Sequence, residues 1–236
     1  KYDKALGQMI RQVKQVPVLI NYTLGRKRYE KTPDIVDLAL GDKIEELDIP
    51  YWFPADRMPE GYNTEQPKVS HGITHVHHFY TKRNLWVLAA VHNKSSPGSS
   101  VLKTWLTSSV LRTTKMYKFT VDRKMGTVMG TLYVPSLWTE NGAFKLLKYK
   151  LGDFVKALHG RGLAVVSTAS ASAFIAGDGS CDYVFTDPPF GGNIMYSELN
   201  FLWEGWLKVF TNNKPEAVEN KTQGKGLLEY QRLMTE

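Results

Sequence analysis

Two short apolar runs in the last third of the chain constrain its fold more than any other feature. Residues 163–167 (LAVVS) follow a helical pattern that ends at 160–162 (GRG), and residues 183–186 (YVFT) precede another helical pattern. Strands buried on both faces of a parallel sheet have such continuous apolar composition, and helices connect them. The order helix, strand, loop, strand, helix therefore predicts an α/β protein with a parallel sheet.

The rest of the chain is predicted to be mostly helical. Apolar residues recur at helical spacing in residues 1–20 and again from 35 to about 47, with a loop or short hairpin between them at 21–34. Thr81 is a suitable N-cap for a helix that begins at residue 82. Further helices are expected at 144–159, at 197–209 and from about 224, and strand alternation predicts a hairpin at 126–134.

Positive charge is concentrated in residues 103–150. This stretch holds nine Lys and Arg residues against two acidic ones, an excess equal to the whole net charge of +7. Seven aromatic residues are interleaved with the cations. Cations neutralise phosphates and aromatic rings stack on unpaired bases, so the mixture is typical of nucleic-acid binding. The alternative is a solvated basic face whose aromatic side chains point into a core.

Composition excludes several classes of protein. The chain contains no run of 18 apolar residues, so no membrane span is predicted. The single Cys181 excludes a disulfide framework and fits a reducing, cytoplasmic compartment. Four histidines cluster in sequence, but no acidic residue or cysteine lies close to them, and we predict no metal site. These histidines are His71, His75, His77 and His78.

The sequence Asp187-Pro188-Pro189-Phe190 stands at the end of the second predicted strand, and two glycines and an asparagine follow it. Ligands of open α/β sheets bind beyond the carboxyl ends of the strands. Two prolines hold the backbone extended while their carbonyls remain free to accept hydrogen bonds. An anionic acceptor, a rigid carbonyl and an aromatic ring together can receive a planar base that has an exocyclic amine. The alternative is a tight turn that closes a strand.

Such a receptor predicts a chemistry. Two acceptors that hold both hydrogens of an exocyclic amine favour a more tetrahedral nitrogen, whose lone pair can attack an electrophilic methyl group. The catalytic contribution would come from positioning and electrostatics.

The block at 183–207 resembles the catalytic-motif region of bacterial amino-group DNA methyltransferases, which use S-adenosylmethionine and an (Asp/Asn/Ser)-Pro-Pro-(Tyr/Phe) motif. The continuation YSELNFLWE at 196–204 is similar to the large "adenine-specific DNA methylase" group, as are segments 77–85 and 130–136. The resemblance implies a partial Rossmann-like methyltransferase sheet with an inserted basic segment and an N-terminal helical region. It implies adenine N6 as the favoured target, in a restriction-modification or related system.

The resemblance also implies roles for individual residues. Asp187 and the Pro188 carbonyl would hold the amine, Pro189 would stiffen the loop, and Phe190 would stack on a base flipped out of the duplex. The implied cofactor contacts are Thr81, Arg83, Asn84, Ser170 and Asp187. Thr81 and its neighbours stand at a helix N-terminus and could equally hold a DNA phosphate or only cap the helix. The implied DNA contacts are Arg112, Lys115, Lys118, Arg123, Lys124 and Tyr196.

We divide the chain into four regions: an N-terminal helical region and connector (1–70), a helix with a cofactor or phosphate contact (71–102), a basic-aromatic DNA-facing insertion (103–150) and a partial α/β core (151–236). The glycine-rich loop that wraps the cofactor in this family is not found, and the first residue is not Met. We therefore expect a fragment of a longer enzyme that works with further parts or subunits. N4-cytosine, RNA or protein glutamine as the acceptor, or a non-catalytic DNA-binding role, remain alternatives.

Overall fold

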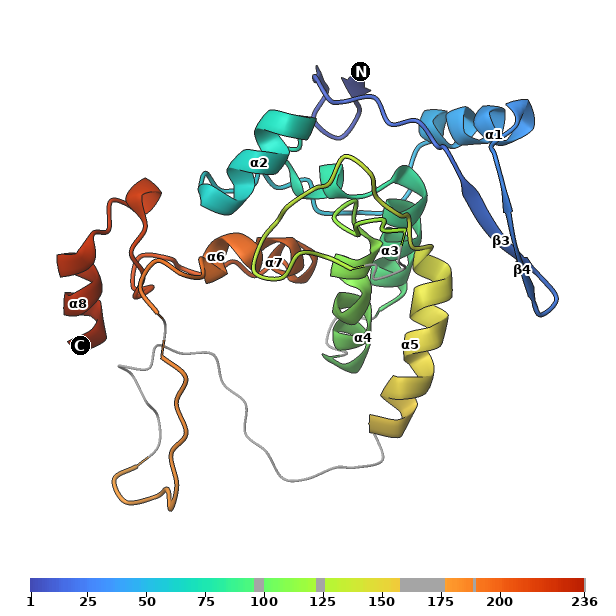
Figure 1. Cartoon of the computed structure of the whole chain (residues 1–236). Coiled ribbons are helices and arrows are strands. Elements are labelled where there is room, and N and C mark those ends of the chain that lie inside the picture. Colours follow the sequence, from blue (N-terminus) through green and yellow to red (C-terminus); the bar gives the residue numbers. More distant parts are fainter. Residues whose placement is uncertain (96–99, 122–125, 158–176, 189, 236) are drawn as a thin grey trace.

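The computed structural model describes residues 1–95, 100–121, 126–157, 177–188 and 190–235. The described chain is mixed α/β, with many helices and two small antiparallel sheets (Figure 1). None of its described helices has both the length and the apolar character needed to cross a membrane.

The sheets are two hairpins at the amino-terminal end. Strands β1 (Tyr2–Asp3) and β2 (Gln8–Met9) pair first, and β3 (Ile20–Leu24) pairs with β4 (Lys27–Lys31). The second pair confirms the hairpin expected within 21–34, whereas the helix predicted for residues 1–20 is wrong. Gly7 turns the first hairpin at a φ of +64°, and Pro17 has no N–H to donate within a helix.

Helices make up most of the remaining structure. They are α1 (Ile35–Glu46), α2 (Tyr62–His71), α3 (Lys82–Lys94), α4 (Ser100–Val110), α5 (Ala143–Ala157), α6 (Tyr196–Leu199), α7 (Phe201–Leu207) and α8 (Leu227–Thr235). Short 3-10 turns occur at Val76–Phe79, Leu111–Thr113 and Lys221–Gln223. The helices expected near 35, 82, 144, 197 and 224 are thereby confirmed.

Local sequence explains where two of these helices begin. The Asp34 side chain accepts from the backbone N–H groups of Val36 and Asp37, and the Asp37 side chain accepts in return from Asp34 N–H, which forms a complete capping box for α1. Thr81 caps α3 in the same manner, because its hydroxyl accepts from Asn84 N–H at 3.3 Å.

One apolar core holds the molecule together. Helices α3, α4, α5 and α7 surround it (Figure 1), and Met116, Leu132 and Val134 contribute from the irregular segments 114–121 and 126–142. Its fully buried side chains include Phe79, Leu88, Leu106, Leu202 and Trp206. The core draws on each of the four predicted regions, since Met58, Ile73, Leu132 and Leu202 all belong to it.

Two regions that were expected to form strands, residues 126–134 and 183–186, do not form them. Residues 126–134 form no hairpin, and only isolated bridges join Lys118 to Gly126 and to Trp138. Residues 183–186 run as an exposed, unpaired segment. A strand requires a neighbour to satisfy its backbone groups, and no described segment is placed beside this one. The strand predicted at 163–167 lies outside the described residues.

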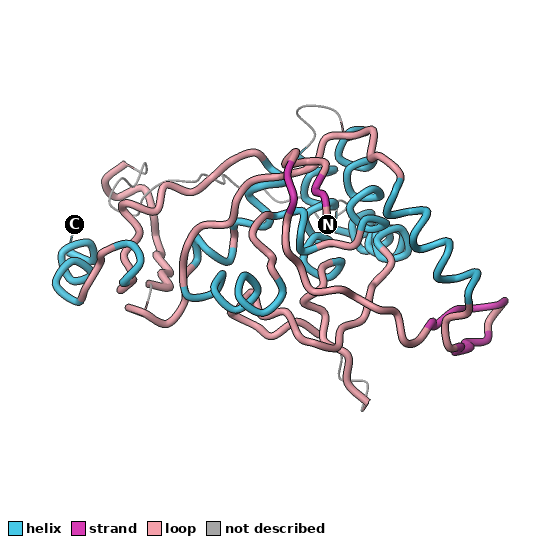
Figure 2. Tube along the Cα trace, turned by 90° about the horizontal axis from the view of Figure 1, so that it is seen from above, coloured by secondary structure: helices cyan, strands magenta, loops and turns pink. Residues whose placement is uncertain are grey.

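The two ends of the molecule are built differently. The β3–β4 hairpin forms one extremity and α8 the opposite one, in both views (Figures 1 and 2). Residues 177–188 hang below the body in Figure 1, beside neither α3 nor the hairpin.

Candidate functional site

The motif segment is open to solvent. Asp187 and Pro188 are exposed, and the ring of Phe190 is 69% exposed. Pro189 lies outside the described residues. The backbone turns just after the motif, where Asn193 N–H donates to the Phe190 carbonyl at 3.1 Å and Gly191 has a φ of +54°. The motif side chains are therefore accessible to a ligand.

The downstream side of the motif is anchored. Glu219 N–H donates to the Gly191 carbonyl at 3.2 Å. A Cβ atom on Gly191 would stand 3.3 Å from Glu219 Oε1, and one on Gly192 would stand 3.4 Å from the Glu219 carbonyl oxygen. The two glycines thus permit a close approach between the motif and residue 219, in addition to the positive φ at the first of them.

Helix α6 follows the motif and is fastened by two carboxylates. Glu198 is 2% exposed and accepts from Asn63 N–H at 2.9 Å, Asn63 Nδ2 at 3.1 Å and Asn220 Nδ2 at 3.2 Å. Because Gly61 caps α2 without a side chain, Glu198 supplies the anionic cap of that helix from far along the chain. No local sequence signal indicates this contact, because 135 positions separate Glu198 from Asn63.

The second carboxylate belongs to Glu216. It accepts from Ser197 N–H at 3.1 Å and from Ser197 Oγ at 2.7 Å. Tyr196, a predicted DNA contact at the start of α6, remains 45% exposed. Helix α6 is therefore held through Ser197 and Glu198, while the Tyr196 side chain remains accessible to solvent.

Helix α7 connects this assembly to the core. The Trp203 indole N–H donates to the Thr107 carbonyl at 3.2 Å, and the Trp206 indole N–H donates to the Tyr80 hydroxyl at 3.2 Å. Trp206 is 1% exposed. Helix α7, which follows the motif and α6 in the chain, therefore contacts α4 through Trp203 and Tyr80 through Trp206.

The predicted cofactor residues at the start of α3 are used internally. Asn84 is buried, and its Nδ2 donates to the carbonyls of Thr113 and Asn141 at 2.9 and 2.8 Å, while its Oδ1 accepts from Ala143 N–H at 2.9 Å. Thr81 Oγ1 donates to Glu140 at 2.7 Å, and Arg83 forms an ion pair with the same carboxylate.

The burial of Asn84 contradicts its expected cofactor role, whereas Arg83 is exposed and the cofactor roles of Thr81 and Arg83 stay predictions. Their polar groups join α3 to the start of α5, and both amide hydrogens of Asn84 are used, so its side chain has no donor left for a cofactor. Of the predicted cofactor contacts, Ser170 lies outside the described residues. Among these contacts, Asp187 alone is exposed and free of a hydrogen bond or ion pair with the described residues.

The predicted DNA contacts fall into exposed residues, a buried residue and residues outside the described part of the chain. Arg112 and Lys118 are exposed, whereas Arg123 and Lys124 lie outside the described residues. Lys115 is buried, and its Nζ donates to the His78 carbonyl at 2.8 Å, so its assignment as a surface DNA contact is wrong. Burial lowers the pKa of the Lys115 ammonium to about 8.

A buried polar cluster joins the amino terminus to the segment before α3. Asp3 Oδ2 lies 2.9 Å from His77 Nε2 and 2.8 Å from His78 Nε2. Asp3 Oδ1 accepts from the N–H groups of Ala5 and Leu6. No local sequence signal predicts this cluster, because 74 positions of the chain separate Asp3 from His77.

The pKa values in this cluster move downward. Burial disfavours the charged form of each imidazole, which lowers the pKa of His77 and lowers that of His78 to about 4, with a further contribution from the neighbouring His77. Burial opposes ionisation of Asp3, but hydrogen bonds from His78 and His77 outweigh it and hold the Asp3 pKa below its ordinary value. At neutral pH the cluster therefore contains a carboxylate and two neutral imidazoles.

Two imidazoles and one carboxylate are a familiar metal-ligand set, and their ligand atoms lie within 4.8 Å of one another. The surrounding donors do not suit a metal. Thr74 N–H donates to His78 Nδ1 at 3.2 Å, so the proton of this neutral ring is on Nε2, where it points at Asp3. A metal-bound histidine would instead donate from Nδ1 to an acceptor. The cluster fits a hydrogen-bonded tether.

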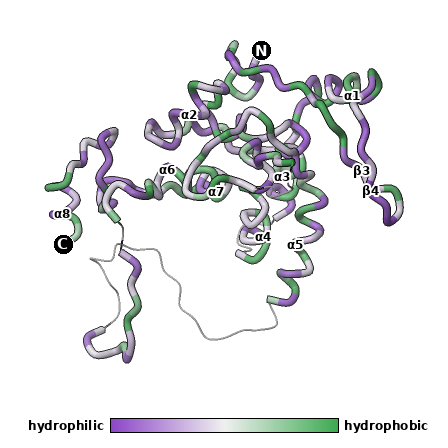
Figure 3. Tube along the Cα trace, in the orientation of Figure 1, coloured by the Kyte–Doolittle hydropathy of each residue, from purple (hydrophilic) through white to green (hydrophobic). Residues whose placement is uncertain are grey.

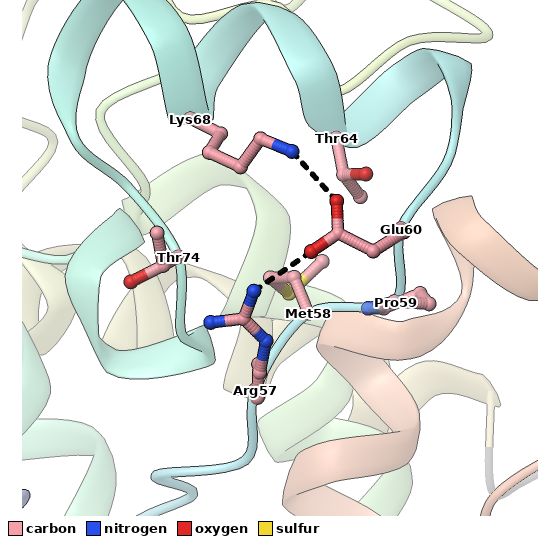
Figure 4. A pocket seen from close by; sticks show the side chains of 7 residues that line it. All are labelled: Arg57, Met58, Pro59, Glu60, Thr64, Lys68 and Thr74. Atoms are coloured by element: carbon pink, nitrogen blue, oxygen red, sulfur yellow. Dashed lines mark hydrogen bonds and ion pairs between the residues drawn. The ribbon is translucent and has the colours of Figure 1, made fainter.

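Two hollows on the described surface lie elsewhere. A small one is lined by Arg57, Met58, Pro59, Glu60, Thr64, Lys68 and Thr74. Among these residues, Glu60 forms ion pairs with Arg57 and Lys68 (Figure 4). A broad, open one is lined by residues 51–53 with Ala5, Ala55 and Asp56. Neither includes a residue of the motif.

No family model, no curated protein and no solved structure matches this chain.

Proposed function

We propose that this chain belongs to an S-adenosylmethionine-dependent DNA methyltransferase that modifies the exocyclic amine of a flipped base, with adenine N6 as the favoured acceptor. The observation behind the proposal is the exposed Asp187-Pro188 pair and Phe190, anchored through Gly191 and α6 to the core. The proposed role requires these groups to be accessible to a base, and they are exposed.

The proposed role of this chain's residues is to bind and orient the base. The Asp187 carboxylate and the Pro188 carbonyl accept the two amino hydrogens, and the Phe190 ring covers one face of the base. These contacts expose the nitrogen lone pair on the side opposite the acceptors. S-adenosylmethionine would supply the methyl group. The described residues do not assemble a site for it, so no further step is assigned to them.

The proposal includes a Rossmann-like parallel sheet in which residues 183–186 are a strand. Tyr183, Val184 and Phe185 are 81%, 66% and 81% exposed in the described structure. Three consecutive large apolar side chains are ordinarily covered in a working protein. Pairing of this segment with other strands would cover them and would place Asp187 at a carboxyl-terminal strand end, where ligands of such sheets bind. A cytoplasmic location, where the enzyme meets its DNA, belongs to the same proposal.

A methyl-transfer assay tests the proposal. The full-length protein that contains this chain is incubated with labelled S-adenosylmethionine and duplex DNA, and transfer is compared among the native protein, Asp187→Ala and Asp182→Ala. Asp182 is an exposed carboxylate five positions upstream and serves as the matched control. Loss of a positioned acceptor should reduce transfer by about 100-fold or more in Asp187→Ala only. Sequencing of the methylated product distinguishes adenine N6 from cytosine N4.

Equal transfer by both variants would refute the role of Asp187. A native chain that binds DNA but transfers no methyl group would point to a non-catalytic DNA-binding protein. Labelled RNA or protein without labelled DNA would move the acceptor to one of those classes.

A further inference from the structure

The β3–β4 hairpin has no role in the core and stands apart from it. Its five residue pairs run from Ile20 opposite Lys31 to Leu24 opposite Lys27, around a turn in which Gly25 has a φ of +61°. Most of its residues are exposed on both faces. The hairpin projects as the outermost element in two perpendicular views (Figures 1 and 2). Isolated two-stranded hairpins are marginally stable in water. A hairpin that projects from the core is therefore a candidate for contact with a partner.

One face of the hairpin combines aromatic and cationic side chains. Tyr22 and Tyr29 stand opposite each other, and their rings stack with centroids 5.4 Å apart. Strand alternation puts Lys27 and Leu24 on the same face, next to this pair. Both tyrosines are more than one third exposed, so the stacked pair is a rigid, accessible surface.

The tip of the hairpin carries unpaired positive charge. Arg26, Lys27 and Arg28 are consecutive and exposed, and none forms an ion pair with another described residue. Glu30 is the single acidic residue between 20 and 31. Lys31 differs from the tip cations because Asp34 and Asp37 hold it. Figure 3 shows the strongly hydrophilic colour at this far end of the hairpin.

We infer that the β3–β4 hairpin is a contact site for duplex DNA, in which Arg26, Lys27 and Arg28 neutralise backbone phosphates and the Tyr22–Tyr29 face lies along a groove. The major groove admits a two-stranded β-ribbon, and phosphate contacts by exposed cations orient such a ribbon. The choice of DNA among polyanions rests on the proposed function. This site is additional to residues 103–150, where sequence analysis placed the DNA-facing region.

The distribution of charge favours a polyanion over an apolar partner. Three adjacent cations without ion-pair partners repel one another. A row of phosphates would neutralise their charges, and release of the counterions condensed on the DNA would favour the complex. A protein partner that covered Tyr22 and Tyr29 would have to desolvate Lys27 on the same face.

The experiment measures binding of the full chain to a fluorescent 20-base-pair duplex by anisotropy across a series of salt concentrations. The hairpin variant combines Arg26→Ala, Lys27→Ala and Arg28→Ala. The control variant combines Lys94→Ala, Lys214→Ala and Lys221→Ala, which removes the same charge from exposed lysines outside the hairpin. Circular dichroism confirms that both variants keep the native helix content.

If the hairpin contacts three phosphates, the slope of log K against log salt should fall in magnitude by about 3 in the hairpin variant. The control variant should keep a slope close to that of the native chain. Equal slopes and affinities in the two variants would overturn the inference, as would tighter binding to duplex RNA of the same sequence.

The outcome also separates this inference from the proposed function. A native chain that binds DNA and transfers methyl groups, with no loss in the hairpin variant, would refute the hairpin site alone. A native chain that binds DNA through the hairpin but transfers nothing would refute the methyltransferase proposal alone. Absence of any DNA binding would refute the hairpin site.

Discussion

Glu198 accepts two hydrogen bonds from Asn63, one from the backbone N–H and one from the side-chain amide, across 135 positions of the chain. The contact joins the residues that follow the motif to the first turn of α2. The carboxylate is buried and serves a helix N-terminus that has no side-chain cap of its own. Stability of the amino-terminal half therefore depends on a residue of the motif region.

The first prediction concerns this carboxylate. Glu198→Ala leaves the buried donors of Asn63 and Asn220 without an acceptor, so the free energy of unfolding should fall by about 2–3 kcal/mol. Urea denaturation followed by circular dichroism measures the change. Glu30→Gln, at an exposed hairpin position, serves as the control and should alter stability little. A loss no larger than that of the control would show that Glu198 does not cap α2.

A second prediction uses two glycines in different surroundings. A Cβ at Gly61 would stand 2.0 Å from Glu198 Oε1, so Gly61→Ala must displace the carboxylate and should lower the melting temperature. Gly41 lies inside α1 with open space around it, and Gly41→Ala should stabilise the protein by roughly 0.5–1 kcal/mol. Melting curves of both variants provide the measurement. Effects of the same sign would contradict the packing at Gly61.

Acid sensitivity should arise from the histidine cluster. In the folded protein the His78 pKa is about 4, against an ordinary value of 6.5. Between these values the unfolded chain binds more protons, so the free energy of unfolding should decrease as the pH falls from about 6.5 toward 4. The contribution of Asp3 persists through this window, because its depressed pKa means that it is lost only below about 3.8.

Proton NMR of the imidazole resonances tests this prediction directly. The His78 signal should remain at its neutral position until the pH approaches 4. A midpoint near 6.5 would show that the ring is solvated and that the Asp3 tether is absent.

Lys115 should make the free energy of unfolding depend on pH in the alkaline range. Its pKa is about 8 when folded and 10.5 ordinarily, so the unfolded chain holds the extra proton between these values. Raising the pH through this window should therefore increase the contribution of this site to the free energy of unfolding by up to about 3 kcal/mol. Lys115→Met should remove that increment in denaturation experiments at pH 8 and pH 10. Identical differences between the two pH values in native and variant protein would place the amine in water.

Metal ions should leave the Asp3 cluster unchanged. The proton on His78 Nε2 occupies the position that a metal would need, so chelation with EDTA should not shift the melting temperature. Calorimetric titration with Zn²⁺ should show no heat that Asp3→Asn abolishes. A saturable heat lost in that variant would establish a metal centre.

The sequence predicted those elements whose signals are local. Thr81 predicts a helix that begins at residue 82, and the apolar spacing from residue 35 predicts another; α3 and α1 begin at these positions. The helix expected over residues 1–20 is wrong because Gly7 favours a turn and Pro17 favours an extended chain, although the apolar spacing is helical. Periodicity alone does not reveal whether a face has anything to pack against.

The site was harder to predict because its contacts are remote in sequence. The pairing of Asp3 with His77 and the burial of Lys115 depend on how distant segments meet, and charge counting treats a buried lysine and an exposed one alike. Residues 183–186 have the composition of a strand, but a strand also needs neighbours, and composition does not supply them.

The remote cap on α2 has a consequence for biosynthesis. During translation, the first turn of this helix emerges from the ribosome long before Glu198 is polymerised, and its N–H groups must rely on water until then. Native closure of the amino-terminal half should thus be a late event, and a nascent chain halted before residue 198 should be more readily captured by chaperones or cut by proteases than a chain whose residues 198–220 have left the ribosome.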